Sequence, residues 1–301
     1  MTGIIPIDKP KDITSFGVVA KMRGITKEKK AGHTGTLDPM ATGALPILFG
    51  GATRFLELLP DHNKGYRAKL KLGITTDTLD ITGNILSEKE VNTSLSDFES
   101  VLPDFRGNIS QIPPMFSAVS VDGKRLYDLA RQGLEVERKP RQVTVEKLEL
   151  VNFNEQNNEY EIDVVCSKGT YIRAIVDDIG KKLGCGAVMT DLRRTLAMGF
   201  SIDRCVTIEQ MQHRKDENIG FDDILVSVEE TLKPYDAVTV SEPQSVRFSN
   251  GGGLDLVRVK KEINHGELYR VYSPNGLFLG LGQGDFENNQ LAVKRLLVKR
   301  D

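Results

Sequence analysis

The alternation of apolar and polar residues predicts a mixture of strands and helices along most of the chain. The clearest strand is residues 65–73, where Tyr66 and apolar positions 68, 70 and 72 share one face and basic residues occupy the other. Residues 171–183 place isoleucine and valine at helical spacing, and Gly184 follows as a typical helix stop. Further strands are predicted at 3–8, 142–152 and 159–166, and further helices at 14–23, 52–59, 94–102 and 124–133.

The pattern changes in the last third of the chain. The acidic segment 216–230 is predicted to hold a surface helix that leads into a linker. From Pro234 onward, glycine, asparagine and proline separate short β-like runs, which is typical of a small β-barrel or sandwich. We expect these runs at 237–240, 256–259, 268–272, 277–281 and 291–297, and we interpret the glycine-rich residues 280–284 as a β-turn.

These elements indicate an α+β protein with two domains. At 301 residues the chain exceeds the usual size of one domain, so one large and one small domain are expected. The change of pattern places residues 1–232 in the first domain and 233–301 in the second. Periodicity alone predicts mixed strands and helices and does not decide how the strands pair.

Composition restricts the class of protein. Hydrophobic residues make up 39% and charged residues 27%, as in a globular protein with a substantial core. No apolar run approaches the roughly 20 residues that span a bilayer, and the N-terminus does not resemble a signal peptide. Cys166, Cys185 and Cys205 lack the spacing of a disulfide framework or zinc site, so we expect a cytoplasmic protein without a metal.

The charge distribution permits a basic face despite a net charge of −2. Residues 1–80 carry 12 Lys and Arg against 8 Asp and Glu, whereas residues 201–240 carry 4 against 9. This asymmetry is compatible with nucleic-acid binding at one surface. The alternative for any single cluster is ordinary solvated charge.

One loop holds the strongest candidate for chemistry. Residues 32–44 contain three glycines, a proline and a single carboxylate, Asp38, directly before an apolar run at 45–49. Glycine and proline at such spacing specify a tight backbone, and an acidic side chain on a rigid loop can serve as a nucleophile or base. The alternative is that Asp38 forms an Asx-turn or caps a short helix.

The segment 31–43, followed by 51–54, closely resembles the catalytic signature of the bacterial tRNA pseudouridine synthase B family (TruB). Other family motifs match in the same order, and together they cover nearly all of residues 3–210. They lie at 8–10, 64–66, 73–80, 111–118, 123–127, 166–173 and 192–195. The C-terminal part matches more weakly and resembles the family's small RNA-binding PUA-type domain.

The resemblance implies a fold, an activity and a partner. The fold would be the pseudouridine synthase fold, a mixed, largely antiparallel sheet with flanking helices, with an RNA-contacting insertion at about 112–141. The activity would be the isomerisation of uridine 55 in the T-loop of tRNA to pseudouridine, without a cofactor or metal. The partner would be the T-arm stem-loop of tRNA, bound by a monomer that needs no protein partner.

The resemblance also implies roles for individual residues. Asp38 would be the nucleophile, and the choice between attack at ribose C1′ and a glycal intermediate stays open. Arg173 would keep Asp38 ionised, because an arginine is always charged and binds a carboxylate with a fixed fork. Tyr66 would stack on the flipped uracil, with its hydroxyl placed for proton removal from C5. His33 would hold the extruded base out of its stack, and further substrate or RNA contacts are expected from Arg54, Lys64, Asp80, Lys124, Arg141 and Tyr171.

Two alternatives remain at this point. The first is a pseudouridine synthase of the same superfamily that partner proteins guide to other RNAs. The second is an RNA-binding or folding-assistance protein without catalysis, which the PUA-like end permits. Asp38, Tyr66 and Arg173 together argue against the second, because binding alone requires no buried carboxylate in that loop.

Overall fold

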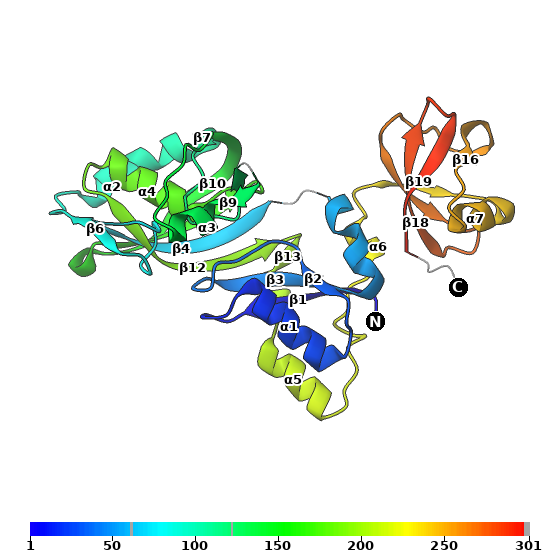
Figure 1. Ribbon diagram of the computed structural model, residues 1–301, viewed down its shortest axis with the longest axis horizontal. Helices are drawn as coiled ribbons and strands as arrows, with labels where there is room; N and C mark the ends of the chain where they lie inside the picture. The colour runs from blue at the N-terminus through cyan, green and yellow to red at the C-terminus, as the bar shows by residue number, and fades with distance from the viewer. Residues whose placement is uncertain (61–62, 122, 298–301) are drawn as a thin grey trace.

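A computed structural model describes residues 1–60, 63–121 and 123–297. Its largest feature is a mixed sheet in which β1 pairs in parallel with β14 and β3 with β12, while the other neighbours are antiparallel (Figure 1). The predicted α+β class with a largely antiparallel sheet is therefore confirmed. In spatial order the strands are β14 (Val206–Thr207), β1 (Gly3–Lys9), β3 (Thr42–Phe49), β12 (Ala187–Ala197), β4 (Lys64–Leu72), β11 (Glu159–Cys166), β10 (Arg141–Asn154) and β7 (Gly107–Gln111), with β2 (Ala31–His33) beside β3 and β13 (Phe200–Ser201) beside β12.

The centre of the sheet follows the predicted period of two. In β4 the side chains of Tyr66, Ala68 and Leu70 are buried, whereas Arg67 on the opposite face is exposed and pairs with Asp163 of β11 at 2.8 Å. The strands predicted at 142–152 and 159–166 are β10 and β11, which form a hairpin around the short turn η3 (Glu155–Asn157). The apolar face of these strands packs against the helix α4 (Ile172–Lys182), which follows the predicted helical spacing.

Two helices cover the other end of the sheet. α1 (Ser15–Thr26) corresponds to the helix predicted at 14–23, and its N-cap is Thr14, whose hydroxyl accepts a hydrogen bond from the backbone N–H of Gly17 at 2.9 Å. α5 (Ile208–Asp216) lies beside α1, and both pack on β1 and β3 (Figure 1). α2 (Leu95–Val101) and η2 (Leu102–Phe105) belong instead to the core that contains α4, and η4 (Ile202–Arg204) follows β13.

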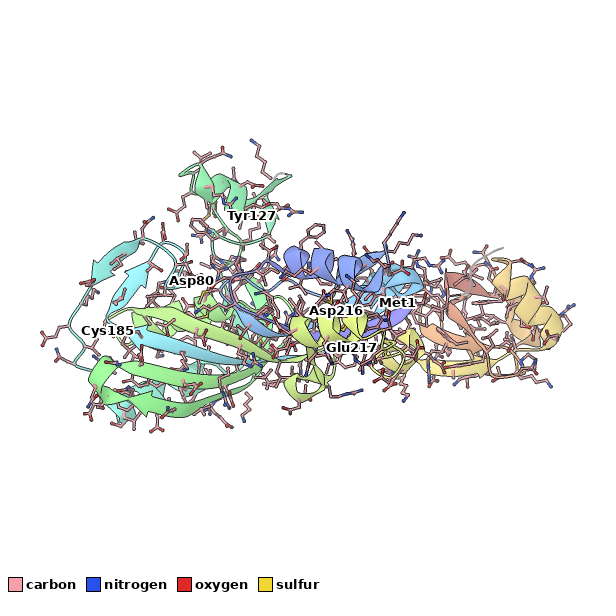
Figure 2. The ribbon with its side chains drawn as sticks, turned by 90° about the horizontal axis from the view of Figure 1, so that it is seen from below. Met1, Asp80, Tyr127, Cys185, Asp216 and Glu217 are labelled. Carbon is pink, nitrogen blue, oxygen red and sulfur yellow. The ribbon has the colours of Figure 1, made fainter. Side chains whose placement is uncertain are left out.

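Two small hairpins extend from the main sheet. β5 (Ile74–Thr76) pairs with β6 (Ile85–Glu88), and β8 (Ser120–Val121) pairs with β9 (Lys124–Arg125) before α3 (Leu126–Arg131). Figure 2 shows the segment that carries Tyr127 standing away from the main sheet. This segment lies within the insertion that the resemblance places at 112–141.

A five-stranded sheet occupies one end of the elongated molecule (Figure 1). Its order is β15 (Asp236–Thr239), β17 (Leu268–Tyr272), β18 (Phe278–Asp285), β19 (Gln290–Leu296) and β16 (Leu254–Asp255), with α7 (Glu242–Ser249) and η5 (Leu256–Arg258) beside it. It meets the rest of the chain at η1 (Gly50–Leu58) and α6 (Val228–Thr231), where Phe55 contacts Phe278 with ring centroids 6.4 Å apart. The PUA label and the boundary at 232/233 remain predictions.

Several local predictions were wrong. The helix expected in 216–230 is displaced: α5 ends at Asp216, α6 covers only four residues, and 217–227 hold no helix. The strand predicted at 256–259 is absent, because residues 256–258 form the 3-10 helix η5, and the helix predicted from 124 begins at Leu126. The expected turn at 280–284 lies inside β18, where Gly280 has a φ of 151° and a Cβ would come within 2.1 Å of the Arg295 carbonyl oxygen.

Candidate active site

Asp38 lies in a tight turn that immediately precedes β3. The backbone N–H of Ala41 donates to the Asp38 carbonyl at 3.0 Å, which closes the turn across Pro39. Gly43 follows with a φ of +105°, and a Cβ there would lie 2.2 Å from the Arg194 carbonyl oxygen. Only glycine combines this backbone conformation with so close a neighbour, so the loop's path into β3 is fixed at Gly43.

Two buried cations hold the backbone of this loop. The Lys9 ammonium group, which is fully buried, donates to the carbonyls of Pro39 at 3.1 Å and Ala41 at 2.5 Å. The Arg194 guanidinium, 1% exposed, donates to the carbonyls of Gly35 at 3.2 Å and Ala44 at 2.7 Å, on either side of Asp38. These hydrogen bonds fix backbone carbonyls before and after Asp38, so the carboxylate is presented on a rigid backbone.

Arg173, in the first turn of α4, connects three separate segments through one guanidinium group. Its Nη2 atom lies 3.1 Å from Asp38 Oδ2 and donates to the Phe116 carbonyl at 2.9 Å. Its Nη1 atom donates to the Thr78 carbonyl at 2.9 Å and lies 3.3 Å from Asp80 Oδ2. Because Arg173 is only 5% exposed, these partners determine where its charge lies.

Asp80 fixes Arg173 from the side opposite Asp38. Its Oδ1 atom accepts hydrogen bonds from the Thr78 hydroxyl at 2.9 Å and from the backbone N–H and hydroxyl of Thr82 at 3.0 and 2.5 Å. The preceding residue, Leu79, has a φ of +64°, a strained conformation for a side chain of this kind. The Asp80 carboxylate therefore contacts Arg173 and the loop around Thr78, and no helix follows it that it could cap.

Asp38, Tyr66 and Arg173 line one cavity of about 250 Å³. Lys64 and Tyr171 line the same cavity, so five of the residues predicted from the sequence lie together. The Asp38 side chain keeps 38% of its surface exposed and faces this space, while Tyr66 is 7% exposed and forms part of the wall. A carboxylate that reaches a small cavity of this kind can be held in contact with one bound nucleotide.

The charge of Asp38 is balanced by its neighbours. Partial burial raises the pKa of the Asp38 carboxyl, and the Arg173 guanidinium opposes this by stabilising the ionised form. The Asp80 carboxylate raises the pKa of Asp38 further, and the Lys9 ammonium lowers it. Burial also raises the pKa of the Tyr66 hydroxyl, with Arg194 as the opposing charge, so Tyr66 is a neutral phenol at pH 7.

A second cavity of about 360 Å³ adjoins the first and shares Thr36 and Lys64 with it. His33, Lys168 and Arg194 also line it, which makes its wall basic. Burial lowers the pKa of His33, so its imidazole is neutral at pH 7 and suits stacking better than charge pairing. The position of His33 in a cavity next to that of Asp38 is compatible with its predicted contact with RNA, and that role remains a prediction.

Three predicted RNA contacts lie outside both cavities. Arg54, in η1, donates through Nη2 to the Leu297 carbonyl at 2.9 Å, next to the five-stranded sheet. Lys124 is exposed on β9 and Arg141 is exposed at the start of β10. Their predicted contacts with RNA are not tested by these positions.

Sequence reasoning assigned no role to Lys9 and Arg194, although both lie inside matched motifs. A signal was present for Lys9, which falls two residues after Ile7 and four after Ile5 on the buried face of a strand. Arg194 similarly lies two residues from the buried Leu192 in β12. A cation on the apolar face of a strand indicates a buried group with fixed acceptors.

The pH dependence of stability tests whether the buried Lys9 holds the Asp38 loop. Burial lowers the pKa of Lys9 to about 8 from its ordinary value of 10.5. Between these two values the unfolded chain binds more protons than the folded chain, so the contribution of Lys9 to stability rises with pH. We expect the free energy of unfolding of the wild type to increase relative to Lys9→Met between about pH 7.5 and 9.5, measured by urea denaturation. Lys69→Met, at an exposed position, should show no such trend. A difference in the free energy of unfolding between wild type and Lys9→Met that becomes smaller as the pH rises would contradict the role of Lys9 in holding the loop.

The described ranges hold no group of three or more His, Cys, Asp or Glu side chains placed to bind a metal ion. Within the same part of the chain, no helix is both long and apolar enough to cross a membrane.

Comparisons with known proteins agree along the whole chain. The family model described as TruB family pseudouridylate synthase (N terminal domain) matches residues 23–172. The model for the tRNA pseudouridylate synthase B C-terminal domain matches 173–238, and that for Pseudouridine synthase II TruB, C-terminal, matches 237–297. Among relatives named tRNA pseudouridine synthase B, one from Pseudomonas fluorescens is 44% identical over 99% of this chain and 96% of its own length. Another, from Clostridium tetani, is 42% identical over 99% of this chain and all of its own length.

Solved structures share the fold. A chain in the crystal structure of a Cbf5-Nop10-Gar1 complex superposes with a TM-score of 0.75 at 25% identity, over 99% of this chain and 86% of that one. A chain from an H/ACA RNP bound to a substrate RNA containing 2′-deoxyuridine gives 0.73 at 23% identity, over 100% and 86%. The second likeness concerns the fold alone. Together with the family models, these matches confirm the resemblance and the fold predicted from the sequence.

Proposed function

The chain belongs to the TruB family of pseudouridine synthases, and on that premise we propose that it isomerises uridine 55 in the T-loop of tRNA to pseudouridine. Relatives that are 40–44% identical to this chain over almost their whole length are named tRNA pseudouridine synthase B. The observation that carries the proposal is the Asp38–Arg173 pair, 3.1 Å apart, at a cavity walled by Tyr66.

The reaction conserves every atom of the substrate. The N1–C1′ bond of uridine breaks, the uracil turns within the cavity, and a C5–C1′ bond forms while the proton on C5 is lost and N1 gains one. The enzyme must therefore hold a detached base against the sugar and stabilise the altered ribose. Positioning and charge stabilisation, rather than transfer to another molecule, make up the catalysis.

Asp38 is the group we assign to the ribose. Its carboxylate either attacks C1′ directly or assists formation of a glycal, and both routes require the ionised form. Arg173 supplies the positive charge that keeps Asp38 ionised, and it is itself fixed by Asp80 and two backbone carbonyls. In a partly buried site, such a fixed charge has a larger effect than it would in water.

Tyr66 and Tyr171 are the aromatic residues that line the cavity. We assign the ring of Tyr66 to stacking on the flipped uracil, which holds the base while it is detached. Its raised pKa keeps it a neutral phenol, so its oxygen can take the C5 proton only if the hydroxyl group passes its own proton on to another acceptor. The basic second cavity, with His33, Lys64 and Lys168, is assigned to the flanking RNA.

We also propose that the protein acts alone, as a monomer in the cytoplasm. The support is the identity of 44% over almost the whole length to a relative named tRNA pseudouridine synthase B, compared with 25% to the chain of the Cbf5-Nop10-Gar1 complex. Incubation of the purified chain with an isolated T-arm stem-loop carrying tritium at uracil C5 tests this directly. Tritium release without any other protein or RNA is expected. Release only after a partner is added would favour the guided enzyme, and tight binding without release would favour a binding protein.

A pH profile tests the charge relation between Asp80 and Asp38. Because the Asp80 carboxylate raises the pKa of Asp38, its replacement by Asn should lower that pKa. We expect the acid limb of kcat/KM, which reports ionisation of the free enzyme, to move to lower pH in Asp80→Asn, even though its plateau falls. Asp163→Asn, which breaks the ion pair between Asp163 of β11 and the exposed Arg67 of β4, is the matched control and should leave the acid limb at the same pH. If the acid limb of kcat/KM in Asp80→Asn stays at the wild-type pH or moves to higher pH, the proposed role of Asp38 is contradicted.

A further inference from the structure

Ser117 lies in the cavity of Asp38, on the segment between β7 and β8. Its backbone is fixed on both sides, because its N–H donates to the Met115 carbonyl at 2.9 Å and its carbonyl accepts from the Tyr127 N–H at 3.1 Å. The neighbouring Phe116 carbonyl accepts from Arg173 Nη2 at 2.9 Å. The position of Ser117 relative to Asp38 is therefore set through the same guanidinium group that pairs with the carboxylate.

The hydroxyl group of Ser117 is buried and has no hydrogen-bond partner among the described residues. The residue is 5% exposed, so bulk water scarcely reaches it. Leaving a buried hydroxyl without a partner costs about 1–3 kcal/mol, which makes such an atom uncommon in a folded protein. An orphaned polar atom at the wall of a cavity indicates that its partner is a ligand.

The other buried atoms without partners in the described ranges do not share this position. They are Arg23 Nε, His33 Nδ1 and Tyr160 Oη. The Tyr160 ring is stacked between Phe98 and Phe153, at centroid distances of 3.9 and 4.5 Å, in the hydrophobic core. His33 lines the second cavity, and Arg23 lines neither cavity. Ser117 alone among them faces Asp38 and Arg173.

We propose that Ser117 is a substrate-binding residue whose hydroxyl group forms a hydrogen bond with an oxygen atom of the nucleotide held against Asp38. The inference rests on the proposed function and adds a specificity-determining group to it. A hydroxyl group can both donate and accept, so uracil O2, uracil O4 and the ribose 2′-hydroxyl all match its chemistry. Unlike Asp38 and Arg173, Ser117 supplies no charge, so it distinguishes nucleotides by the position of a polar atom.

This role predicts an effect on catalysis that is separate from stability. Ser117→Ala removes no hydrogen bond formed by the free protein and removes the desolvation cost of an orphaned hydroxyl. The melting temperature should therefore stay the same or rise. The value of kcat/KM should fall by about 10-fold, because one hydrogen bond to the substrate is lost. Ser120→Ala, an exposed serine on β8 in the same segment, is the matched control and should change neither quantity.

Substrate analogues identify the oxygen atom involved. Stem-loops with 2′-deoxyuridine, 2-thiouridine or 4-thiouridine at the target position are treated with the wild type and with Ser117→Ala, and the product nucleoside is measured after digestion. We expect one of these changes to reduce wild-type turnover and to remove the difference between the two proteins, since the bond is then already lost. Loss of the difference with 2′-deoxyuridine assigns Ser117 to the ribose, and loss with a thiouridine assigns it to the base.

Three results would overturn the inference. The first is wild-type activity in Ser117→Ala, and the second is a loss of activity that a lowered melting temperature of the variant explains. The third is a 10-fold difference in kcat/KM between wild type and Ser117→Ala that persists on every analogue. Failure of the proposed function itself gives a different result, because the wild type would then not convert the unmodified uridine.

Discussion

Replacement of Asp38 by Asn is expected to abolish turnover while the protein continues to bind tRNA. Asparagine keeps the size and most of the hydrogen-bonding capacity of aspartate but carries no negative charge, so it can neither attack C1′ nor stabilise a positively charged ribose. Loss of the group that acts on the reacting atoms should lower the rate of tritium release by about 10⁴-fold or more.

The stability of Asp38→Asn should change little. Asp38 keeps 38% of its side chain exposed, and the backbone of its loop is held by Lys9 and Arg194 rather than by its own carboxylate. The dissociation constant for tRNA should accordingly stay within a few-fold of the wild type, as phosphate contacts elsewhere supply most of the affinity. Asp163→Asn serves as the control for loss of a carboxylate away from the cavity. Appreciable turnover by Asp38→Asn would remove Asp38 from the chemistry.

Replacement of Arg173 by Met should damage both folding and catalysis. The guanidinium group contacts Asp38, Asp80 and two backbone carbonyls, and the Met side chain replaces none of these bonds. Asp80 would then be a buried carboxylate, 4% exposed, without its cation, which costs about 3–5 kcal/mol. Asp38 would lose the charge that keeps it ionised, and turnover should fall by at least about 10³-fold.

A double variant separates the two effects of Arg173. In Arg173→Met combined with Asp80→Asn, the uncompensated buried charge is absent, so part of the lost stability should return in urea denaturation. Turnover should not return, because Asp38 still lacks its partner. Arg173→Lys should lie between the wild type and Arg173→Met in both stability and turnover, since an ammonium group keeps the charge but cannot form all four contacts of the guanidinium group. Recovery of turnover in the double variant would assign Arg173 a purely structural role.

Local pattern was sufficient for the elements that form the centre of the main sheet. The strict alternation in 65–73 corresponds to β4 (Lys64–Leu72), and the helical spacing after Tyr171 corresponds to α4 (Ile172–Lys182). These segments have one buried and one polar face, which is the property that periodicity detects. The pairing of their neighbours came instead from the family resemblance, because strand order depends on contacts far apart in the chain.

The missed helices lack that property. α5 (Ile208–Asp216) has Ile208 and Met211 as its buried residues and is otherwise polar, so its composition gave no distinct apolar face. α7 (Glu242–Ser249) contains Pro243, one of the prolines whose spacing suggested a β-rich region, although proline is tolerated in the first turn of a helix. Short helices of this kind are stabilised by packing on the sheet beside them, which a local pattern does not contain.

The candidate site likewise contains residues that the sequence predicted and residues that only the folded structure identifies. Asp38 and Arg173 were predicted because motifs of a known family surround them, and the structure places their charged atoms 3.1 Å apart although 135 residues separate them. The contacts of Lys9 and Arg194 are hydrogen bonds to carbonyls of a loop about 30 and 150 residues away, which no local pattern records. The orphaned hydroxyl of Ser117 is defined by burial and by the lack of a partner, and both are properties of the folded chain.

The most direct test of the account is to map pseudouridine in a full-length unmodified tRNA transcript after treatment with the purified wild-type protein alone. The account predicts pseudouridine at uridine 55 of the T-loop and at no other position, formed without a cofactor, a metal or a partner. Pseudouridine at a different position, or none at all despite bound tRNA, would contradict it.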